Sequence, residues 1–323
     1  MRNIIKWAAL QVPAVRRLRE DRDRLLALAG APRPEPGDTG IPPQQLAAIR
    51  IALQQSRLIL TDYPYHPHER PLATAASGRQ LIARFEQESA RYAETLRGIA
   101  RHIDSLAHIP RAATTPLAPL WDNPWFPPFD GASLYGLIAE SRPGRYIEVG
   151  SGISTRFARQ AVRDLGLQTR IVSIDPHPHN SVDGLCDEII VSRMEDMPAS
   201  FWAGLSPNDM LFVDNSHRSF PASDVTVFFA EVMPALPPGI LYGLHDIFLP
   251  HDYPDAWRER YYSEQYLLMT YLLGGGGRDM IVLPVHWAIE QPDLYGIMAP
   301  LWEQGHLFSG INIGGGCFWM RRG

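Results

Sequence analysis

The sequence has little cysteine, no strong excess of charge of either sign and no long apolar run. Its 323 residues include two cysteines, Cys186 and Cys317, which lie far apart and outside any Cys-x-x-Cys pattern. This argues against a disulfide framework or a structural zinc and favours a reducing cytoplasm. The net charge is −5, so no basic field is present to attract nucleic acid. No stretch has the roughly 20 apolar residues of a membrane span, and the charged N-terminus does not read as a secretory signal.

The front third of the chain is expected to be helical. Apolar spacing predicts helices over 1–30, 44–60 and 78–108, with a proline-rich connector at 31–38. With 45% hydrophobic residues, the chain can form one large and one smaller domain. We expect a helical N-terminal extension over residues 1–110, which offers a surface for homo-oligomer formation, and an α/β domain over 111–323.

Apolar runs alternate with helical stretches in the second part of the chain. Strands are predicted at 145–149, 170–174, 188–191, 210–213 and 239–244, and two more at 280–285 and 316–321. This alternation is typical of a doubly wound, Rossmann-like, mostly parallel sheet. Ligands of such sheets bind at the carboxyl ends of the strands.

A glycine turn follows the first of these strands and indicates a nucleotide-type cofactor site. Gly150 and Gly152 have no Cβ to block a ligand from the backbone. Ser151, Ser154 and Thr155 offer hydroxyls and free N–H groups where the next helix begins. A simple strand-to-helix turn is the alternative, since short glycine motifs recur by chance.

The residues around this turn favour S-adenosylmethionine over a dinucleotide. Asp175 ends the next strand at the spacing of a ribose-binding carboxylate. The third glycine of a dinucleotide motif is absent, and Glu148 already places an acid in the first strand. An acid at that point suits a cofactor whose methionine end carries an ammonium and a sulfonium.

Four segments carry a resemblance to a known family. They are Glu148–Thr155, Ser173–Pro176, Asp209–His217 and Gly239–Asp246. Together they resemble the class I S-adenosylmethionine-dependent methyltransferases, above all a bacterial branch with Asp-Gly-x-His after strand four and His-Asp after strand five. The resemblance covers residues 115 to 323 and implies a seven-stranded sheet with an antiparallel C-terminal hairpin.

The resemblance also implies roles for residues at the strand ends. Glu148, Gly150 and Gly152 line the methionine pocket, Asp175 holds the ribose, Glu195 or Asp196 flanks the adenine, and Ser151, Ser154 and Asp214 complete the cofactor site. The chain departs from the branch at Asn215, where glycine is usual, and at His177 and His179, where an arginine is commoner nearby.

The loops after strands four and five carry the candidate catalytic residues. They are His217, His245 and Asp246, with Asp214 beside them. These loops are neighbours in a doubly wound sheet, and a neutral imidazole is a suitable general base near pH 7. We expect O-methylation of a small-molecule or glycan hydroxyl, because an alcohol needs a positioned base or metal to lose its proton. Capping a helix or orienting the loop is the alternative role for either histidine.

Two other functions remain open. Asp214, His245 and Asp246 resemble the magnesium site of catechol-type O-methyltransferases, although histidine is a poor magnesium ligand. A divalent metal is therefore considered but not favoured. The chain also fits a non-catalytic scaffold or sensor that binds the cofactor without transferring its methyl group.

Two aromatic segments flank these loops. The segment 121–129 either plugs the end of the sheet or forms a wall of the active site, where a ring face attracts a sulfonium. The segments 248–257 and 264–268 also resemble the branch, which implies a lid and an acceptor wall; the rings Tyr253, Trp257, Tyr261 and Tyr262 give it ring-binding character or pack on the C-terminal strands.

Overall fold

The structure, a computed structural model, describes residues 43–54, 59, 68, 70–178 and 182–323. The chain divides into two compact units, Met1–Pro67 and His68–Gly323. Helix α3 (Pro43–Gln54) is the described element of the first unit, within the helix expected at 44–60. The helix expected at 1–30 and the proline-rich connector at 31–38 lie outside the described residues. None of the described helices has the length and apolar character required to cross a bilayer.

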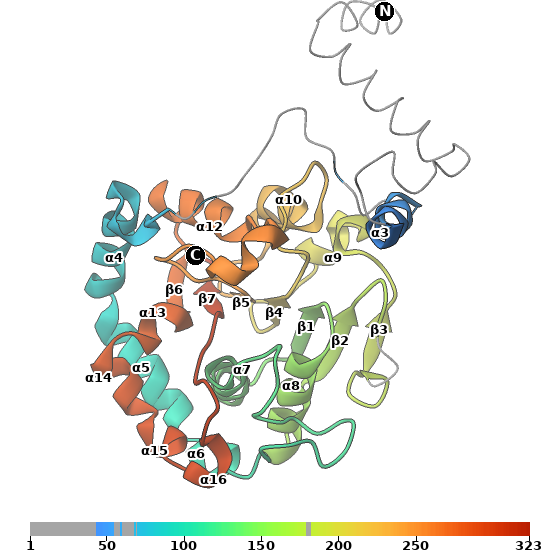
Figure 1. The fold of residues 1–323 in the computed structure, drawn as a ribbon. Coiled ribbons are helices and arrows are strands. Elements are labelled where there is room, and N and C mark those ends of the chain that lie inside the picture. Colours follow the sequence, from blue (N-terminus) through green and yellow to red (C-terminus); the bar gives the residue numbers. More distant parts are fainter. Residues whose placement is uncertain (1–42, 55–58, 60–67, 69, 179–181) are drawn as a thin grey trace, which may run out of the picture. The chain divides into compact units, whose positions relative to one another are not determined.

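The second unit is built around one seven-stranded sheet in the order β3-β2-β1-β4-β5-β7-β6 (Figure 1). Strands β1 to β5 pair in parallel, and β7 runs antiparallel to both β5 and β6. The strands are β1 (Arg145–Val149), β2 (Arg170–Ile174), β3 (Glu188–Ile190), β4 (Met210–Val213), β5 (Leu241–Leu244), β6 (Met280–Pro284) and β7 (Phe318–Arg321). The predicted Rossmann-like sheet is confirmed.

Helices cover both faces of this sheet, with α7 and α8 on one face and α9 and α10 on the other in Figure 1. Those before the sheet and around its first three strands are η1 (Leu72–Thr74), α4 (Ala76–Gln87), α5 (Ser89–Ala100), α6 (Ile103–Leu106), α7 (Pro128–Ser141), α8 (Ile153–Asp164), η3 (Met194–Asp196) and α9 (Ala199–Ala203). The later ones are α10 (Asp224–Val227), η4 (Phe228–Val232), α11 (Met233–Ala235), η5 (Asp255–Arg260), α12 (Glu264–Leu273), α13 (Val285–Ile289), α14 (Pro292–Ile297), α15 (Ala299–Trp302) and α16 (Gly305–Phe308).

The single helix expected at 78–108 is wrong, because the chain forms α4, α5 and α6 instead. A straight helix of that length spans about 45 Å, whereas a break at Glu88 lets the apolar faces follow the domain. The Glu88 carboxylate accepts hydrogen bonds from Tyr92 and Arg91 at the break. Helix α4 packs against α12, and α5 packs against α7 and β6.

These three helices lie on the N-terminal side of the expected domain boundary at residue 110, but they belong to the same compact unit as the sheet. Their buried residues include Phe85, Tyr92 and Leu96. The Phe85 ring lies 6.0 Å from the ring of Phe318 in β7. The division that the structure shows therefore falls before this group of helices, between Pro67 and His68.

The two antiparallel strands are not joined by a tight turn. Helices α13 to α16 lie between them in sequence, and β7 then inserts between β5 and β6. The Trp319 ring of β7 stacks on Phe212 of β4, with centroids 5.3 Å apart. This stacking needs Gly243 in β5, because a Cβ there would lie 2.4 Å from the Trp319 ring.

Candidate active site

The register of the sheet brings the predicted site residues to one edge. Val149 pairs with Val213, and Val213 pairs with Leu244. The residues that follow these strands are therefore adjacent: Gly150 after β1, Asp214 after β4 and His245 after β5. The Asp214 amide donates to Val149 O at 3.0 Å, and the His245 amide donates to Val213 O at 3.0 Å.

The two glycines of the turn have different roles. Gly150 has a φ of +83°, and a Cβ on it would lie 2.4 Å from the Asp214 carbonyl oxygen. This glycine is required by the close approach of β4, rather than by a ligand. At Gly152 an added Cβ would meet no atom within 4 Å, so its backbone faces open space at the start of α8.

That open space is a cavity of about 550 Å³, within the usual range for small-molecule sites. Its lining residues come from the aromatic loop, the glycine turn and the end of β4: Trp125, Phe126, Ser151, Gly152, Ile153, Ser154, Arg156 and Asp214. The first turn of α8 presents backbone N–H groups to it, which favours an anionic group such as a carboxylate.

Asp175 lies beside this turn. Its carboxylate accepts hydrogen bonds from the Ser151 hydroxyl at 2.6 Å and the His177 amide at 2.7 Å. The carboxylate is thus fixed at the end of β2, where a ribose is bound in sheets of this type. Of the two other histidine positions noted in the sequence, His177 contributes its amide here, and His179 lies outside the described residues.

Glu148 lies beneath the turn and does not line the cavity. It is fully buried, and its carboxylate accepts hydrogen bonds from the Tyr146 hydroxyl at 2.8 Å and from the Thr155 hydroxyl. Burial raises the pKa of Glu148 to about 7, although hydrogen bonds from Ser154, Thr155 and Tyr146 oppose the shift. In this structure Glu148 therefore supports the turn, and its contact with a ligand stays a prediction.

Glu195 and Asp196 lie in η3, on the loop after β3. Arg193 holds both: its Nε lies 2.7 Å from Asp196 and 3.7 Å from Glu195. Neither residue lines the cavity described above. Their proposed place beside an adenine stays a prediction.

His217 and His245 form one cluster with Asp214 and Asp246. His217 Nε2 lies 3.3 Å from Asp214 and 3.4 Å from Asp246. His245 Nδ1 lies 3.3 Å from Asp214 and 3.6 Å from Asp246. The two aspartates are thus bridged by two imidazole rings, as the neighbouring loops predicted.

Each histidine also lies close to a third carboxylate, which is fully buried and faces the ring nitrogen on the side away from the two aspartates. His217 Nδ1 lies 2.9 Å from Glu264, the first residue of α12. His245 Nε2 lies 3.3 Å from Asp130, in the first turn of α7. This arrangement leaves His217 Nε2 and His245 Nδ1 facing the two aspartates between the rings.

These carboxylates keep both imidazoles protonated. Burial alone lowers the pKa of His217, but the hydrogen bonds and charges of Asp214 and Glu264 outweigh it and raise the pKa to about 10. Burial also opposes protonation of His245, yet Asp214 and Asp246 raise its pKa well above the usual value. The carboxylates that face each ring favour its protonated form, so the expected neutral imidazole stays a prediction.

The aspartates respond in opposite directions. Burial favours the neutral form of Asp214, but the two adjacent imidazolium rings hold its pKa far below the usual value. Burial raises the pKa of Asp246, and the imidazolium rings only partly offset it. Asp214 is thus the fixed anion of the cluster, and it also lines the cavity.

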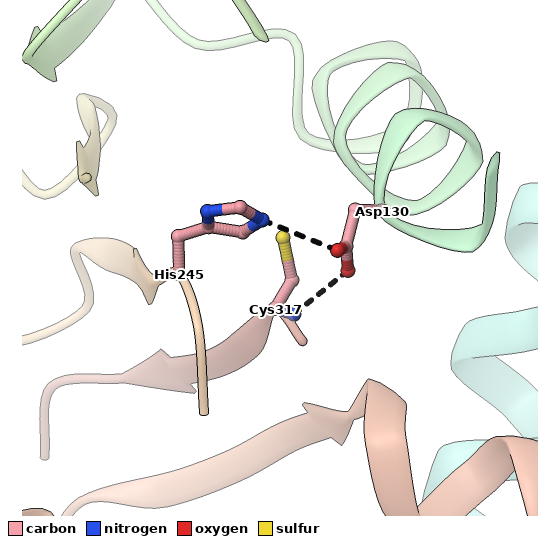
Figure 2. A group of neighbouring side chains, drawn as sticks. All are labelled: Asp130, His245 and Cys317. Carbon is pink, nitrogen blue, oxygen red and sulfur yellow. Dashed lines mark hydrogen bonds and ion pairs between the residues drawn. The ribbon is translucent and has the colours of Figure 1, made fainter. Parts of the chain in front are cut away.

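Asp130, His245 and Cys317 form a second buried group (Figure 2). Within the described part of the chain, this trio has carboxylate, imidazole and thiol atoms within 4.8 Å of one another. Such donors suit zinc better than magnesium. However, Asp130 already accepts hydrogen bonds from the amides of Gly316 and Cys317, and burial raises the pKa of the Cys317 thiol well above its usual value. As it stands, the trio anchors His245 to α7 and to the start of β7.

Sequence reasoning missed Asp130 and Glu264. Each had a signal, because Asp130 is the first acid of the apolar helix Pro128–Ser141, and Glu264 opens the apolar run of α12. Asn215, the departure from the bacterial pattern, donates from Nδ2 to Glu264 at 3.1 Å and accepts from the His217 amide at 2.8 Å. Its amide therefore holds the His217–Glu264 pair in place.

The aromatic loop has both of its expected roles. Trp121 is fully buried and its ring lies 5.2 Å from those of Phe157 and Phe308, so it plugs this end of the domain. Trp125 and Phe126 line the cavity, and the Phe126 ring lies 5.1 Å from His245.

On the opposite side of the cluster, the Tyr262 ring lies 4.7 Å from His217. Tyr253 and Trp257 pack against Tyr262, with centroids 5.8 Å and 5.7 Å away. The segment 248–262 thus contributes rings beside His217, as expected of an acceptor wall.

The residues at the cavity fit S-adenosylmethionine. The N-terminus of α8 and the open backbone at Gly152 suit its carboxylate, Asp175 suits its ribose, and Asp214 with the rings of Trp125 and Phe126 suits its positive charge. Magnesium fits less well at Asp214, His245 and Asp246, because the imidazolium rings already neutralise these aspartates.

The chain was compared with known proteins. Residues 147–247 match a family described as a methyltransferase domain. No curated protein matches the chain. Among solved structures, the SAH-bound methyltransferase PaMTH1 of Podospora anserina is similar, with 15% sequence identity and a TM-score of 0.39. The match covers 81% of this chain and 99% of the PaMTH1 chain.

Two further solved structures are similar over different lengths. Cofactor-bound Rv0187 from MTB is 15% identical, with 79% of this chain and 97% of its own covered and a TM-score of 0.34. MycE of the mycinamycin biosynthetic pathway, in complex with Mg, SAH and mycinamycin VI, is 22% identical over 41% of this chain and 39% of its own, with a TM-score of 0.28. The family match covers β1 to β5, the part of the sheet that carries the glycine turn and the aspartate–histidine cluster. Residues 147–247 are thus similar to a methyltransferase domain, and they lie in a sheet whose first five strands are parallel.

Proposed function

We propose that the chain methylates a hydroxyl group of a small-molecule or glycan acceptor, with His217 as the general base. The observation that best supports this proposal is that Asp214 lines the cavity proposed for the cofactor and also contacts both imidazole rings. The donor site and the ionisable cluster therefore share one residue. An alcohol needs such a positioned base because its own pKa is too high for spontaneous ionisation.

The surroundings of the two histidines assign them different roles. His245 lies against Phe126 on the cavity side, and Asp130 anchors it. His217 lies against Tyr262 on the side of the proposed acceptor wall. His217 Nε2 is therefore the atom that takes the acceptor's proton, while Asp246 and His245 orient it.

Protonated His217 must first release its own proton. When bound, the cofactor supplies an electrophilic methyl group on a positively charged sulfur. Asp214, which faces that charge, then stabilises the imidazolium of His217 less, so the pKa of His217 falls. Neutral His217 accepts the hydroxyl proton at Nε2, and Glu264 stabilises the new imidazolium through Nδ1.

The test is methyl transfer from labelled S-adenosylmethionine to a panel of hydroxylated metabolites and sugars. We expect His217→Ala and Asp246→Ala each to lower turnover by about 10²-fold or more, with cofactor affinity nearly unchanged. His251→Ala is the matched control, because this exposed histidine pairs with Glu290 away from the cluster. Full activity in both variants would place the acceptor on other loops.

Two outcomes separate this function from its alternatives. Activity that survives EDTA supports a histidine base alone, whereas activity lost to EDTA and restored by a divalent ion supports a metal at Asp214, His245 and Asp246. Tight binding of S-adenosylhomocysteine without labelled product from any acceptor supports a scaffold or sensor.

A further inference from the structure

Two arginines lie on the aromatic side of the cluster. The Arg218 guanidinium lies 5.0 Å from the Tyr262 ring centroid. The Arg260 guanidinium lies 4.3 Å from the Trp257 ring and 5.7 Å from the Tyr262 ring. The Tyr262 ring also packs on His217. This one ring is therefore in contact with His217 and with both guanidinium groups.

The backbone on either side of these arginines is tied together. Arg218 Nε donates to the Arg260 carbonyl at 2.8 Å, and Arg218 Nη1 donates to the Ser216 carbonyl at 3.2 Å. The Ser263 amide donates to the His217 carbonyl at 2.7 Å. The loop after β4, which carries His217, and the segment before α12 therefore hold both guanidinium groups in a fixed place.

Neither arginine has an acidic partner within 4.0 Å among the residues that the structure describes, although both are only half exposed. Arg258, in the same short helix as Arg260, shows the contrast, because it pairs with Asp255 at 2.6 Å. A guanidinium presents five N–H donors that match a carboxylate or phosphate. Stacking on the Trp257 ring holds the Arg260 guanidinium without using these donors, whereas Arg218 uses Nε and Nη1 for the two carbonyls and keeps Nη2 for a ligand.

We infer that the acceptor is an anion, whose carboxylate or phosphate is bound by Arg218 and Arg260 while its hydroxyl faces His217. This rests on the proposed function for the position of the hydroxyl. The rings of Trp257 and Tyr262 hold the two arginines in place, and the arginines select the charge of the acceptor. The substrate class is therefore a hydroxylated acid, such as an acidic sugar or a hydroxyaryl acid.

The test measures binding of probes to the full chain saturated with S-adenosylhomocysteine, by calorimetry. The carboxylate probes are glucuronate and 4-hydroxybenzoate, the phosphate probe is glucose 6-phosphate, and the neutral counterparts are glucose and 4-hydroxybenzamide. We expect at least one charged probe to bind about tenfold or more tightly than its neutral counterpart, as a charge-assisted contact requires.

Substitutions test whether the two arginines cause the preference for charged probes. Arg260→Met keeps an apolar stem on Trp257 but removes the charge, and it should abolish the preference for the charged probe. Arg260→Lys should restore part of it, and Arg258→Met, on the paired arginine of the same helix, should leave it unchanged. Arg218→Met should weaken the charged probe alone; since Arg218 also holds the loop, its thermal unfolding is measured alongside.

The outcomes distinguish this inference from the proposed function. Equal affinities for charged and neutral probes, or a preference that survives Arg260→Met, overturn the anionic acceptor even if neutral hydroxyls are methylated. Failure to bind any charged probe also overturns it. A preference that depends on Arg260, without methyl transfer to any bound probe, supports the anion site and counts against the proposed O-methylation instead.

Discussion

At the scale of residues, the site depends on carboxylates at two different places, of which Asp214 lies beside the two imidazole rings. Asp214 faces both the cavity and the imidazole rings. Asp175 lies at the end of β2 with its carboxylate fixed by Ser151 and the His177 amide. The proposed function gives these two acids different parts of the cofactor, so substitutions at them should separate binding from catalysis.

Asp175→Ala should weaken S-adenosylhomocysteine binding by about 1.5–3 kcal/mol, the value of a charge-assisted hydrogen bond. Calorimetric titration at one pH measures it, with one site per chain expected for the wild type. Asp183→Ala, an exposed acid nearby, is the control and should bind as the wild type does. An unchanged affinity in Asp175→Ala would show that the ribose lies elsewhere.

The protonated histidines predict how stability depends on pH. The pKa of His217 is raised to about 10 in the folded protein, whereas an unfolded histidine titrates near 6.5. The stabilisation is therefore complete below about pH 6.5 and is lost as the pH rises toward 10, with a slope of at most about 1.4 kcal/mol per pH unit per proton.

Chemical denaturation between pH 6 and 10 measures this loss of unfolding free energy. His217→Gln, which cannot titrate, should flatten the curve over this range. A variant with the same slope as the wild type would show that His217 is not protonated in the folded state.

The sequence predicted the inner cluster but not its outer partners. His217, His245 and the two aspartates follow strand ends, and sheet topology alone makes such residues neighbours. Asp130 and Glu264 come from the starts of helices α7 and α12. Whether a helix start faces the site depends on tertiary packing, which spacing along the chain does not encode. Asp130 and Glu264 add to the effect of the two aspartates on the pKa of each histidine, and this contribution could not be read from the sequence.

At the scale of elements, the glycine turn joins β1, α8 and the end of β4. Gly150→Ala should destabilise the protein by about 2 kcal/mol or more, since its φ is +83° and its Cβ would meet the Asp214 carbonyl at 2.4 Å. Gly152→Ala should fold normally, because no atom lies within 4 Å of its Cβ, but it should bind S-adenosylhomocysteine at least about tenfold more weakly because that Cβ enters the cavity.

Thermal unfolding and calorimetry on both variants measure these two effects. Normal cofactor affinity in Gly152→Ala would show that the ligand does not approach the backbone at this turn.

The strands were predicted to within a few residues, whereas the long helix was not. Parallel strands buried on both faces appear as short continuous apolar runs, and β1, β2 and β4 have this pattern. The apolar stripe across 78–108 is equally regular, but it continues through the breaks after Gln87 and Ala100. The periodicity of apolar residues indicates which face of a helix is buried, but it does not indicate where the helix axis bends.

At the scale of the whole molecule, the described site residues lie within the unit His68–Gly323. A protein truncated before His68 should therefore bind S-adenosylhomocysteine with unchanged affinity, as an autonomous domain does. Calorimetry on the truncated and full-length chains measures this, with circular dichroism to show that both are folded. Weaker binding by a folded truncated chain would show that the first unit contributes to the site.

Strand β7, inserted between β5 and β6, sets the order in which the molecule can be completed during synthesis. Until residues 318–321 leave the ribosome, β5 and β6 have no strand between them, and both present unpaired backbone edges. Such edges are templates for pairing with other chains. Cys317, whose amide donates to Asp130 (Figure 2), precedes this strand directly, and Asp130 also contacts His245. Closing the sheet therefore also brings the Gly316 and Cys317 amides to Asp130, so the edges that favour aggregation and the support of the residue that holds His245 are completed together.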